Sequence, residues 1–463
     1  MVPRAVLLAA LIAVTQLTGC AVFRSYDSEL QETNQQLVAG NVDAALALLE
    51  SNNKSDVKDL LYYFEKGELL RSKGDLQGSQ QAWRVADGVV FEWEEAVKLD
   101  TEKYLSQFAS YLVNDKVRRY QGYDYEKVML TTQMALNLLA QNDFAGARTE
   151  IKKTHEREAV IAELRDKQYL KGEQEAEQQG ASTEFKDLKG YPVASLDDPE
   201  VVSLKNSYQS AFSHYLSGFV YEALGEKGLA APGYRTAAEL RPKTPLLEQA
   251  LLNLDGKQAK AGESDVLIVV QSGLAPARDS MRIPLPLTID GNLVITTLSF
   301  PVIREDNSTA RFGEVYLNDQ AVSLTSLNNT SAMSRRALRD DMPEIILRTS
   351  VRAVSRTLAQ KKLNEVDPLA ALIVGIAAAV VEGADTRTWR TLPNQTQVAR
   401  VHLAQGEHRL SLPAILGSGT LKVKIDQPYQ VISLRVLGHQ VFASGAAIQL
   451  PQPAQAPVLA NLK

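Results

Sequence analysis

The chain has 463 residues, of which 45% are hydrophobic and 23% charged, and its formal net charge is −5 at pH 7. This length accommodates two or three domains, and the mild acidity argues against nucleic acid as the main partner. The chain contains one cysteine, Cys20, so no disulfide can form within it and packing must supply its stability.

The first twenty residues predict export and a lipid anchor. Arg4 and the apolar run 5–14 have the charge and length of a secretory signal peptide, and the run is too short to span a membrane. The sequence Leu17-Thr18-Gly19-Cys20 follows, and it resembles the lipobox of bacterial lipoproteins. The resemblance implies a cleaved signal at 1–19 and a tether at 20–30 that begins with acylated Cys20. The alternative is an ordinary signal peptide with a chance cysteine.

Lipid attachment would fix the location of the mature chain. Several acyl chains, at about 0.8 kcal/mol per buried methylene, hold a protein on a membrane essentially permanently. Ala21 follows the cysteine, where lipoproteins retained in the inner membrane tend to carry Asp. We therefore expect the periplasmic face of the outer membrane if the source is Gram-negative.

Residues 31–256 are expected to form successive pairs of helices. One unit resembles the tetratricopeptide pattern through His214, Ser217, Gly218, Tyr221, Ala230, Tyr234, Ala237 and Pro242. Two further units have small residues at Gly67 and Ala135, which are 68 residues apart, or two periods of 34. A single pair cannot bury its apolar face, so the pairs are expected to stack into an all-α solenoid.

One stretch of this region departs from the repeat. Residues 148–179 read as a single long charged helix, and residues 180–198 as a loop with two glycines, a proline and two aspartates. The resulting charged insertion, 171–200, is either a partner-binding feature or a solvated spacer, and both interpretations stay open.

Residues 257–262 read as a linker, and residues 263–450 as a mixed α/β domain that ends in a disordered tail at 451–463. The predicted strands occupy residues 264–273, 282–289, 293–302, 311–324, 397–403, 408–412, 421–425, 431–436 and 440–443. A long helix at 334–364 and an Ala-rich helix at 369–381 are expected among them. The predicted fold class is therefore α + β multidomain, with an antiparallel sheet or small sandwich in the C-terminal domain.

Three groups of side chains are candidates for binding. Arg348, Arg352 and Arg356 are spaced by four along the long helix and form either a basic surface or a solvated face. A dense polar and aromatic cluster consists of Asp385, Arg387, Trp389 and Arg390, which could bind a sugar or peptide or could fix a loop. The helical region offers Trp83 and Trp93 as aromatic anchors for a partner protein.

The sequence contains no catalytic signature, so we expect no enzymatic activity. It has neither the G-x-S-x-G motif nor a phosphate-binding glycine loop. His402 and His408 lack a neighbouring carboxylate motif, and we predict no metal and no cofactor.

The order of parts resembles an uncharacterised family of bacterial outer-membrane lipoproteins with an N-terminal tetratricopeptide-like region. The resemblance rests on the strand at 266–273, the prolines that follow it, and the run 385–393 after an Ala-rich helix. We expect a non-enzymatic periplasmic adaptor that binds envelope proteins in a helical-repeat groove, with peptidoglycan synthesis as one process. The alternatives are a glycan-binding or glycan-processing protein, and an accessory lipoprotein of a secretion or polysaccharide-export assembly.

Overall fold

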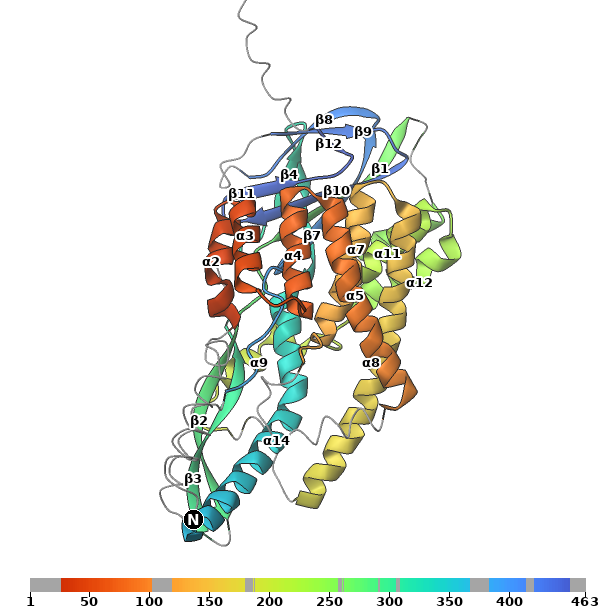
Figure 1. Ribbon diagram of the computed structural model, residues 1–463. Helices are drawn as coiled ribbons and strands as arrows, with labels where there is room; N and C mark the ends of the chain where they lie inside the picture. The colour runs from red at the N-terminus through yellow and green to blue at the C-terminus, as the bar shows by residue number, and fades with distance from the viewer. Residues whose placement is uncertain are drawn as a thin grey trace, which may run out of the picture.

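The computed structural model describes residues 26–101, 119–179, 186, 188–256, 260, 262–289, 292–304, 309–366, 383–413 and 420–449. The lipid-attachment candidate Cys20 and the Ala-rich segment 369–381 lie outside the described residues. Within them the chain is a mixed α and β protein, in which a group of upright helices lies beneath two sheets and a second group of elements extends away from the body (Figure 1).

The described part of the N-terminal region contains four antiparallel helix pairs and one closing helix, besides two short helices between the third and fourth pairs. The pairs are α2 (Tyr26–Val38) with α3 (Val42–Asn52), α4 (Leu60–Lys73) with α5 (Leu76–Leu99), α7 (Asp124–Ala140) with α8 (Phe144–Gln179), and α11 (Ala211–Ala223) with α12 (Lys227–Leu240). The closing helix is α13 (Pro245–Leu254). Each pair contacts the next along the chain, so the predicted stacking of helix pairs is present.

The turn inside each pair has the same backbone feature. Gly40, Gly74, Asn142 and Gly225 all have positive φ, between 62° and 90°. This left-handed conformation ends a helix without strain when the residue is glycine or asparagine. The first three turns are spaced by 34 and 68 residues, which matches the period in the sequence.

Glycines also set the distance between paired helices. The indole of Trp83 in α5 lies directly on Gly67 in α4, where a Cβ would come within 2.1 Å of the indole nitrogen. Tyr234 in α12 lies on Gly218 in α11 in the same way, at 2.4 Å. The small residue in the first helix therefore receives the bulky residue of the second.

The C-terminal region contains two five-stranded sheets and a hairpin. The first sheet has the order β11-β10-β1-β7-β6, and the second β12-β9-β8-β4-β5. Their strands are β1 (Glu263–Ser272), β4 (Glu314–Leu317), β5 (Gln320–Ser323), β6 (Thr325–Asn329), β7 (Gln395–Ala404), β8 (Gly406–Ser411), β9 (Leu421–Ile425), β10 (Tyr429–Leu437), β11 (Gln440–Ala443) and β12 (Ile448–Gln449). The hairpin pairs β2 (Arg278–Ile289) with β3 (Asn292–Ile303).

The second sheet is antiparallel throughout, as one of the two predicted forms requires, but the first sheet is not. β1 pairs with β10 in parallel and with β7 antiparallel, so the first sheet is mixed. A parallel pair requires a long connection between its strands, and here that connection includes the hairpin, α14 and four of the five strands of the second sheet.

The first sheet is a middle layer. Leu267 and Val269 of β1 pack against the helices, whereas Val266, Ile268 and Val270 pack against the second sheet. Strand residues alternate between faces, so a continuous apolar run is expected where both faces are covered. The two sheets pack face to face as a sandwich. The helical array covers the other face of the first sheet.

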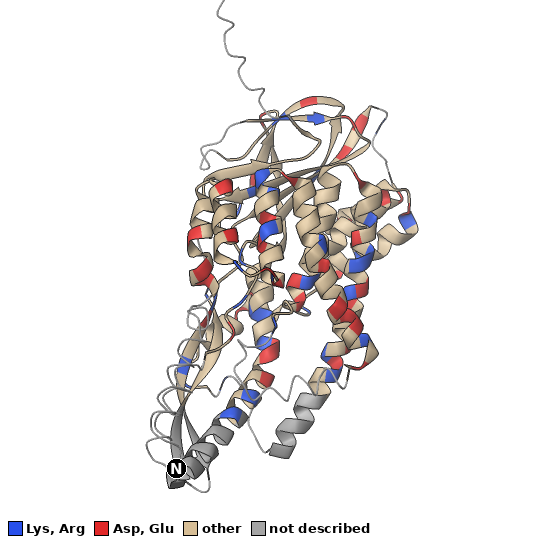
Figure 2. Ribbon diagram, viewed as in Figure 1, with Lys and Arg blue, Asp and Glu red and all other residues tan. Residues whose placement is uncertain are grey.

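The elements that extend from the body are α14 (Thr330–Val366), the β2–β3 hairpin and the distal part of α8 (Figure 1). The described part of the insertion folds against α14 through two short helices, α9 (Val193–Leu196) and α10 (Pro199–Val202). Asp198 accepts a hydrogen bond from buried Arg335 of α14 at 3.2 Å. Figure 2 shows charges of both signs along α8 and α14. Among the described helices, none has the length and apolar character needed to cross a membrane.

Candidate functional site

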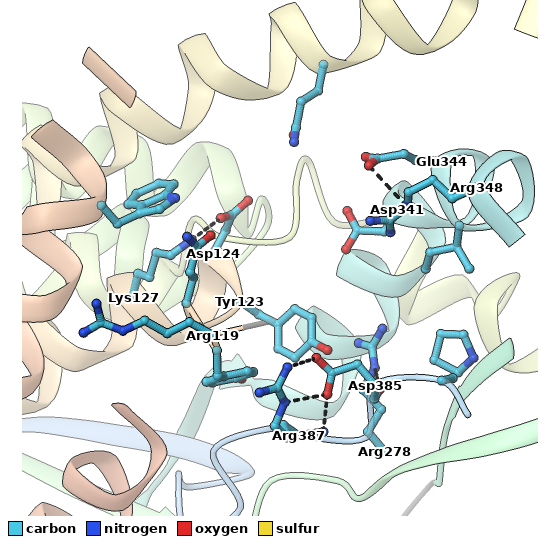
Figure 3. A pocket seen from close by; sticks show the side chains of 18 of the residues that line it. Arg119, Tyr123, Asp124, Lys127, Arg278, Asp341, Glu344, Arg348, Asp385 and Arg387 are labelled. Atoms are coloured by element: carbon cyan, nitrogen blue, oxygen red, sulfur yellow. Dashed lines mark hydrogen bonds and ion pairs between the residues drawn. The ribbon is translucent and has the colours of Figure 1, made fainter. Parts of the chain in front are cut away.

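A pocket of about 160 Å³ lies where the helical pairs meet the extended elements. Its walls come from the start of α7, the middle of α8, the base of the β2–β3 hairpin, α14 and the segment 384–387. Six basic and four acidic side chains line it: Arg119, Lys127, Arg165, Arg278, Arg348, Arg387, Asp124, Asp341, Glu344 and Asp385. Figure 3 labels all of these side chains except Arg165 and shows that they come from several elements around the pocket.

The start of α7 is held firmly. Gly122 has φ of 78°, and the N–H of Tyr123 donates to the Glu126 carboxylate at 2.9 Å, which closes the first helical turn. The rings of Tyr120 and Tyr123 lie 6.0 Å apart and nearly perpendicular. This turn therefore presents two fixed tyrosine rings to the pocket.

One wall is a chain of ion pairs. Asp124 accepts from Lys127 at 3.1 Å and from Arg165 at 2.6 Å, and Arg165 reaches Asp341 of α14 at 2.5 Å. Burial alone would raise the pKa of Asp124, but the two cations outweigh it and hold that pKa at about 2. The Lys127 ammonium lies 3.6 Å from the centre of the Trp93 ring. The charged groups of this wall are paired with one another, and these pairs join α7, α8 and α14.

The floor contains two arginines stacked on the two tyrosines. Arg387 forms a two-pronged pair with the Asp385 carboxylate at 2.8 and 2.9 Å, and its guanidinium carbon lies 5.3 Å from the Tyr120 ring centre. The Arg278 guanidinium lies 4.4 Å from the Tyr123 ring centre, and its Nε donates to the main-chain carbonyl of Asp385 at 3.2 Å. Asp385 thus orients both guanidinium groups.

Two of the predicted binding tryptophans are core residues. Trp83 and Trp389 have no exposed surface, and Trp389 stacks on Phe64 at 4.5 Å. They cannot act as surface anchors in this conformation. Trp93, which is 5% exposed, lines the pocket beside Lys127.

The burial of Trp389 has a specific cause, because two helix carboxylates bind its loop. Glu126 accepts the N–H of Trp389 at 2.7 Å, and Glu65 accepts the N–H groups of Arg390 and Thr391 at 2.8 and 3.0 Å. The Arg390 side chain then pairs with Asp27 of α2 at 2.7 Å. Of the predicted cluster, Asp385 and Arg387 line the pocket, whereas the other two residues fasten the loop to the helical region.

The predicted basic surface is divided. Arg348 lines the pocket and lies 3.6 Å from Glu344, and Arg352 donates to the Arg348 carbonyl at 3.4 Å. The side chain of Arg356 lies outside the described residues. Of the two arginines whose side chains are described, Arg348 lies at the pocket and Arg352 does not line it.

Most of the pocket was not predictable from sequence. Arg278, Lys127, Arg165 and Asp341 come from four separate elements, and no spacing connects them. The tyrosines before α7 were noticeable only as an aromatic stretch. Among the described residues, no group of three His, Cys, Asp or Glu side chains is placed to hold a metal ion.

Comparison with known proteins assigns no identity. No family model and no curated protein matches the chain. A crystal structure of a tetratricopeptide repeat protein from Parabacteroides merdae aligns with 50% of this chain and 98% of its own, at 13% sequence identity and a TM-score of 0.14. A likeness this low carries no argument, so the functional assignment rests on this chain's own residues.

Proposed function

We propose that this chain is a non-enzymatic, lipid-anchored adaptor of the bacterial envelope that recognises a partner at the pocket between the helical pairs and the extended elements. Cys20 would carry the lipid on the periplasmic face of the outer membrane. The partner would be an envelope protein, with peptidoglycan as the second candidate.

The observation that carries this proposal is the occupancy of the inner face of the helical array. Sixteen of the seventeen residues of α7 are buried, and α11 packs with residues of β1, β7 and β10. Helical-repeat proteins usually bind partners on such a face. Here the chain's own sheet fills it, so the groove expected from the sequence is not free and the open pocket is the better recognition site.

The glycan alternative receives less support. It relied on Trp389 stacking on a sugar ring, but this side chain is fully buried between Phe64 and Trp83. Asp385 and Arg387 remain accessible from the pocket, so a glycan could enter only through polar contacts. The export-assembly alternative is a different partner for the same anchored adaptor.

Lipid attachment is tested by metabolic labelling with a palmitate analogue in the native host. The wild-type chain should be labelled and sediment with outer membranes, and Cys20→Ala should be unlabelled and leave the outer-membrane fraction. An unlabelled wild-type chain would remove the anchor from the proposal.

Partner recognition is tested by placing a photo-crosslinking amino acid at Arg119, on the pocket rim, in intact cells. The matched control is Arg235 on α12, an exposed arginine outside the pocket. A discrete protein adduct at 119 and none at 235 supports the adaptor. Adducts with glycan strands alone, or the same products at both positions, contradict it.

A further inference from the structure

We propose that the pocket binds an oxyanion, a phosphate or carboxylate group, and that Arg278 is its principal ligand. This inference rests on the proposed function, because it names the chemical group that the same recognition site would accept.

Arg278 is a buried cation without a direct ion pair. Burial alone would lower its pKa, but Tyr123, Asp341 and Asp385 nearby outweigh that effect and raise the pKa, so the pocket stabilises the charged form. It is 4% exposed, its Nη1 atom is buried without a hydrogen-bond partner, and no described carboxylate lies within the 4.0 Å limit of an ion pair. Arginine stays protonated in proteins, so this charge cannot be removed by deprotonation. Burying a charge costs several kcal/mol unless a partner offsets it.

The other deeply buried arginines of the molecule are paired. Arg157 contacts Asp87 at 2.8 Å, Arg435 contacts Glu68 at 2.8 Å, and Arg335 contacts Asp198 at 3.2 Å. Arg278 is the exception to this pattern among the described residues, and it is the one that lines the pocket. Binding of an anion from outside the chain would give Arg278 the direct ion pair that the other three already have.

The geometry prepares Arg278 to bind. Its plane is fixed by the Tyr123 ring and its Nε by the Asp385 carbonyl, while its Nη1 has no hydrogen-bond partner within the described residues. A planar fork of two N–H donors matches the oxygen spacing of carboxylate and phosphate. Figure 3 shows Arg278 beside Tyr123 and the Asp385–Arg387 pair, with Arg348 across the pocket.

The charge and volume of the pocket limit the kinds of ligand that it can bind. The pocket has more basic than acidic side chains, in a chain whose net charge is −5. Its volume of about 160 Å³ is smaller than the roughly 300–1,000 Å³ of sites that enclose a whole small-molecule ligand. The pocket therefore fits the anionic end of a ligand or partner, while the remainder stays outside.

The test is calorimetric titration of the full-length chain, purified in detergent, with inorganic phosphate, succinate and glycerol phosphate. These probes separate a free phosphate, a carboxylate and a lipid-type headgroup. We expect saturable binding of at least one probe, weakening as NaCl is raised. Arg278→Gln should lose about tenfold or more in affinity, as expected for a charge-assisted hydrogen bond.

Two control variants accompany this loss. Arg335→Gln removes an equally buried arginine that pairs with Asp198 outside the pocket, and it should bind as the wild type does. Arg278→Lys keeps the charge but not the fork, and it should bind with intermediate affinity. If Arg278→Gln does not fold, Arg278→Lys still tests the proposal. Wild-type affinity in that variant would show that the two-donor guanidinium group of Arg278 is not the ligand.

Thermal unfolding without added anion gives an independent readout. Arg278→Gln should lower the unfolding temperature less than Arg335→Gln does, because Arg278 forms no direct ion pair whereas Arg335 pairs with Asp198. Absence of saturable binding to all three probes, or equal binding by Arg278→Gln, overturns the oxyanion site. If either of these negative binding results came with a partner crosslink at position 119, the adaptor proposal would still hold and only the anionic ligand would be rejected.

Discussion

The carboxylate of Glu126 in α7 accepts the main-chain N–H of Trp389 at 2.7 Å, joining the helical region to a loop 263 residues later. The same carboxylate accepts from Tyr120, Tyr123 and Thr388. One side chain therefore closes the first turn of α7, orients a pocket tyrosine and holds the loop that carries Asp385 and Arg387.

Replacement of Glu126 by Ala should be strongly destabilising, because several buried donors lose their acceptor at once. We expect a loss of about 3–5 kcal/mol in the free energy of unfolding, measured by urea titration. The matched control is Glu95→Ala on the exposed face of α5, where the pair with Lys98 contributes less than about 1 kcal/mol. Equal effects of the two changes would contradict the role assigned to Glu126.

Glu65 should make stability depend on pH. Burial raises its pKa to about 7, although hydrogen bonds from Thr391 and Arg390 lower it. The native state therefore holds this proton more tightly than the unfolded chain does, and stability falls as pH rises from about 4.5 to about 7. At about 1.4 kcal/mol per pKa unit, the loss is about 3 kcal/mol.

The measurement compares wild type with Glu65→Gln at pH 5 and pH 8. The variant lacks this titration, so the difference in unfolding free energy between the two proteins should change between the two pH values. A difference that is the same at pH 5 and pH 8 would show that Glu65 titrates normally.

Sequence periodicity predicted the helical pairs and most strands because each depends on local spacing. The small residues Gly67 and Gly218 are local signals of this kind. The parallel pairing of β1 with β10 has no local signal, since it depends on where the chain returns after most of the second sheet. The same limit applied to Trp389, whose burial depends on acceptors contributed by two distant helices.

The contact between Gly67 and Trp83 can be tested with a pair of glycines. Gly67→Ala places a Cβ within 2.1 Å of the Trp83 indole, so we expect a loss of about 1–3 kcal/mol from overpacking. Gly88→Ala, on α5 with nothing within 4 Å of the added carbon, should be neutral or stabilising by up to about 1 kcal/mol. Thermal or urea unfolding of both variants measures the contrast, which a neutral Gly67→Ala would abolish.

Arg157 of α8 should contribute strongly to the stability of the helical region. It is 2% exposed, forms ion pairs with Glu94 and Asp87 of α5, and donates to the Lys127 carbonyl at 2.8 Å. Arg157→Met leaves two buried carboxylates without this cation, and we expect a loss of about 3–5 kcal/mol. Arg148→Met, which breaks an exposed pair with Glu226, should cost less than about 1 kcal/mol in the same urea titration.

The first sheet also determines when folding can finish, because it needs a strand from near the end of the chain. Its central strand β1 finds its parallel neighbour β10 only near the end of the chain, and the inner surfaces of α4, α7 and α11 are covered by these strands and by the loop before β7. If the chain is exported N-terminus first, as we propose, its apolar helices are exposed until its last strands have crossed the membrane. A periplasmic holdase, or rapid completion of transport, would have to protect the first half during that interval.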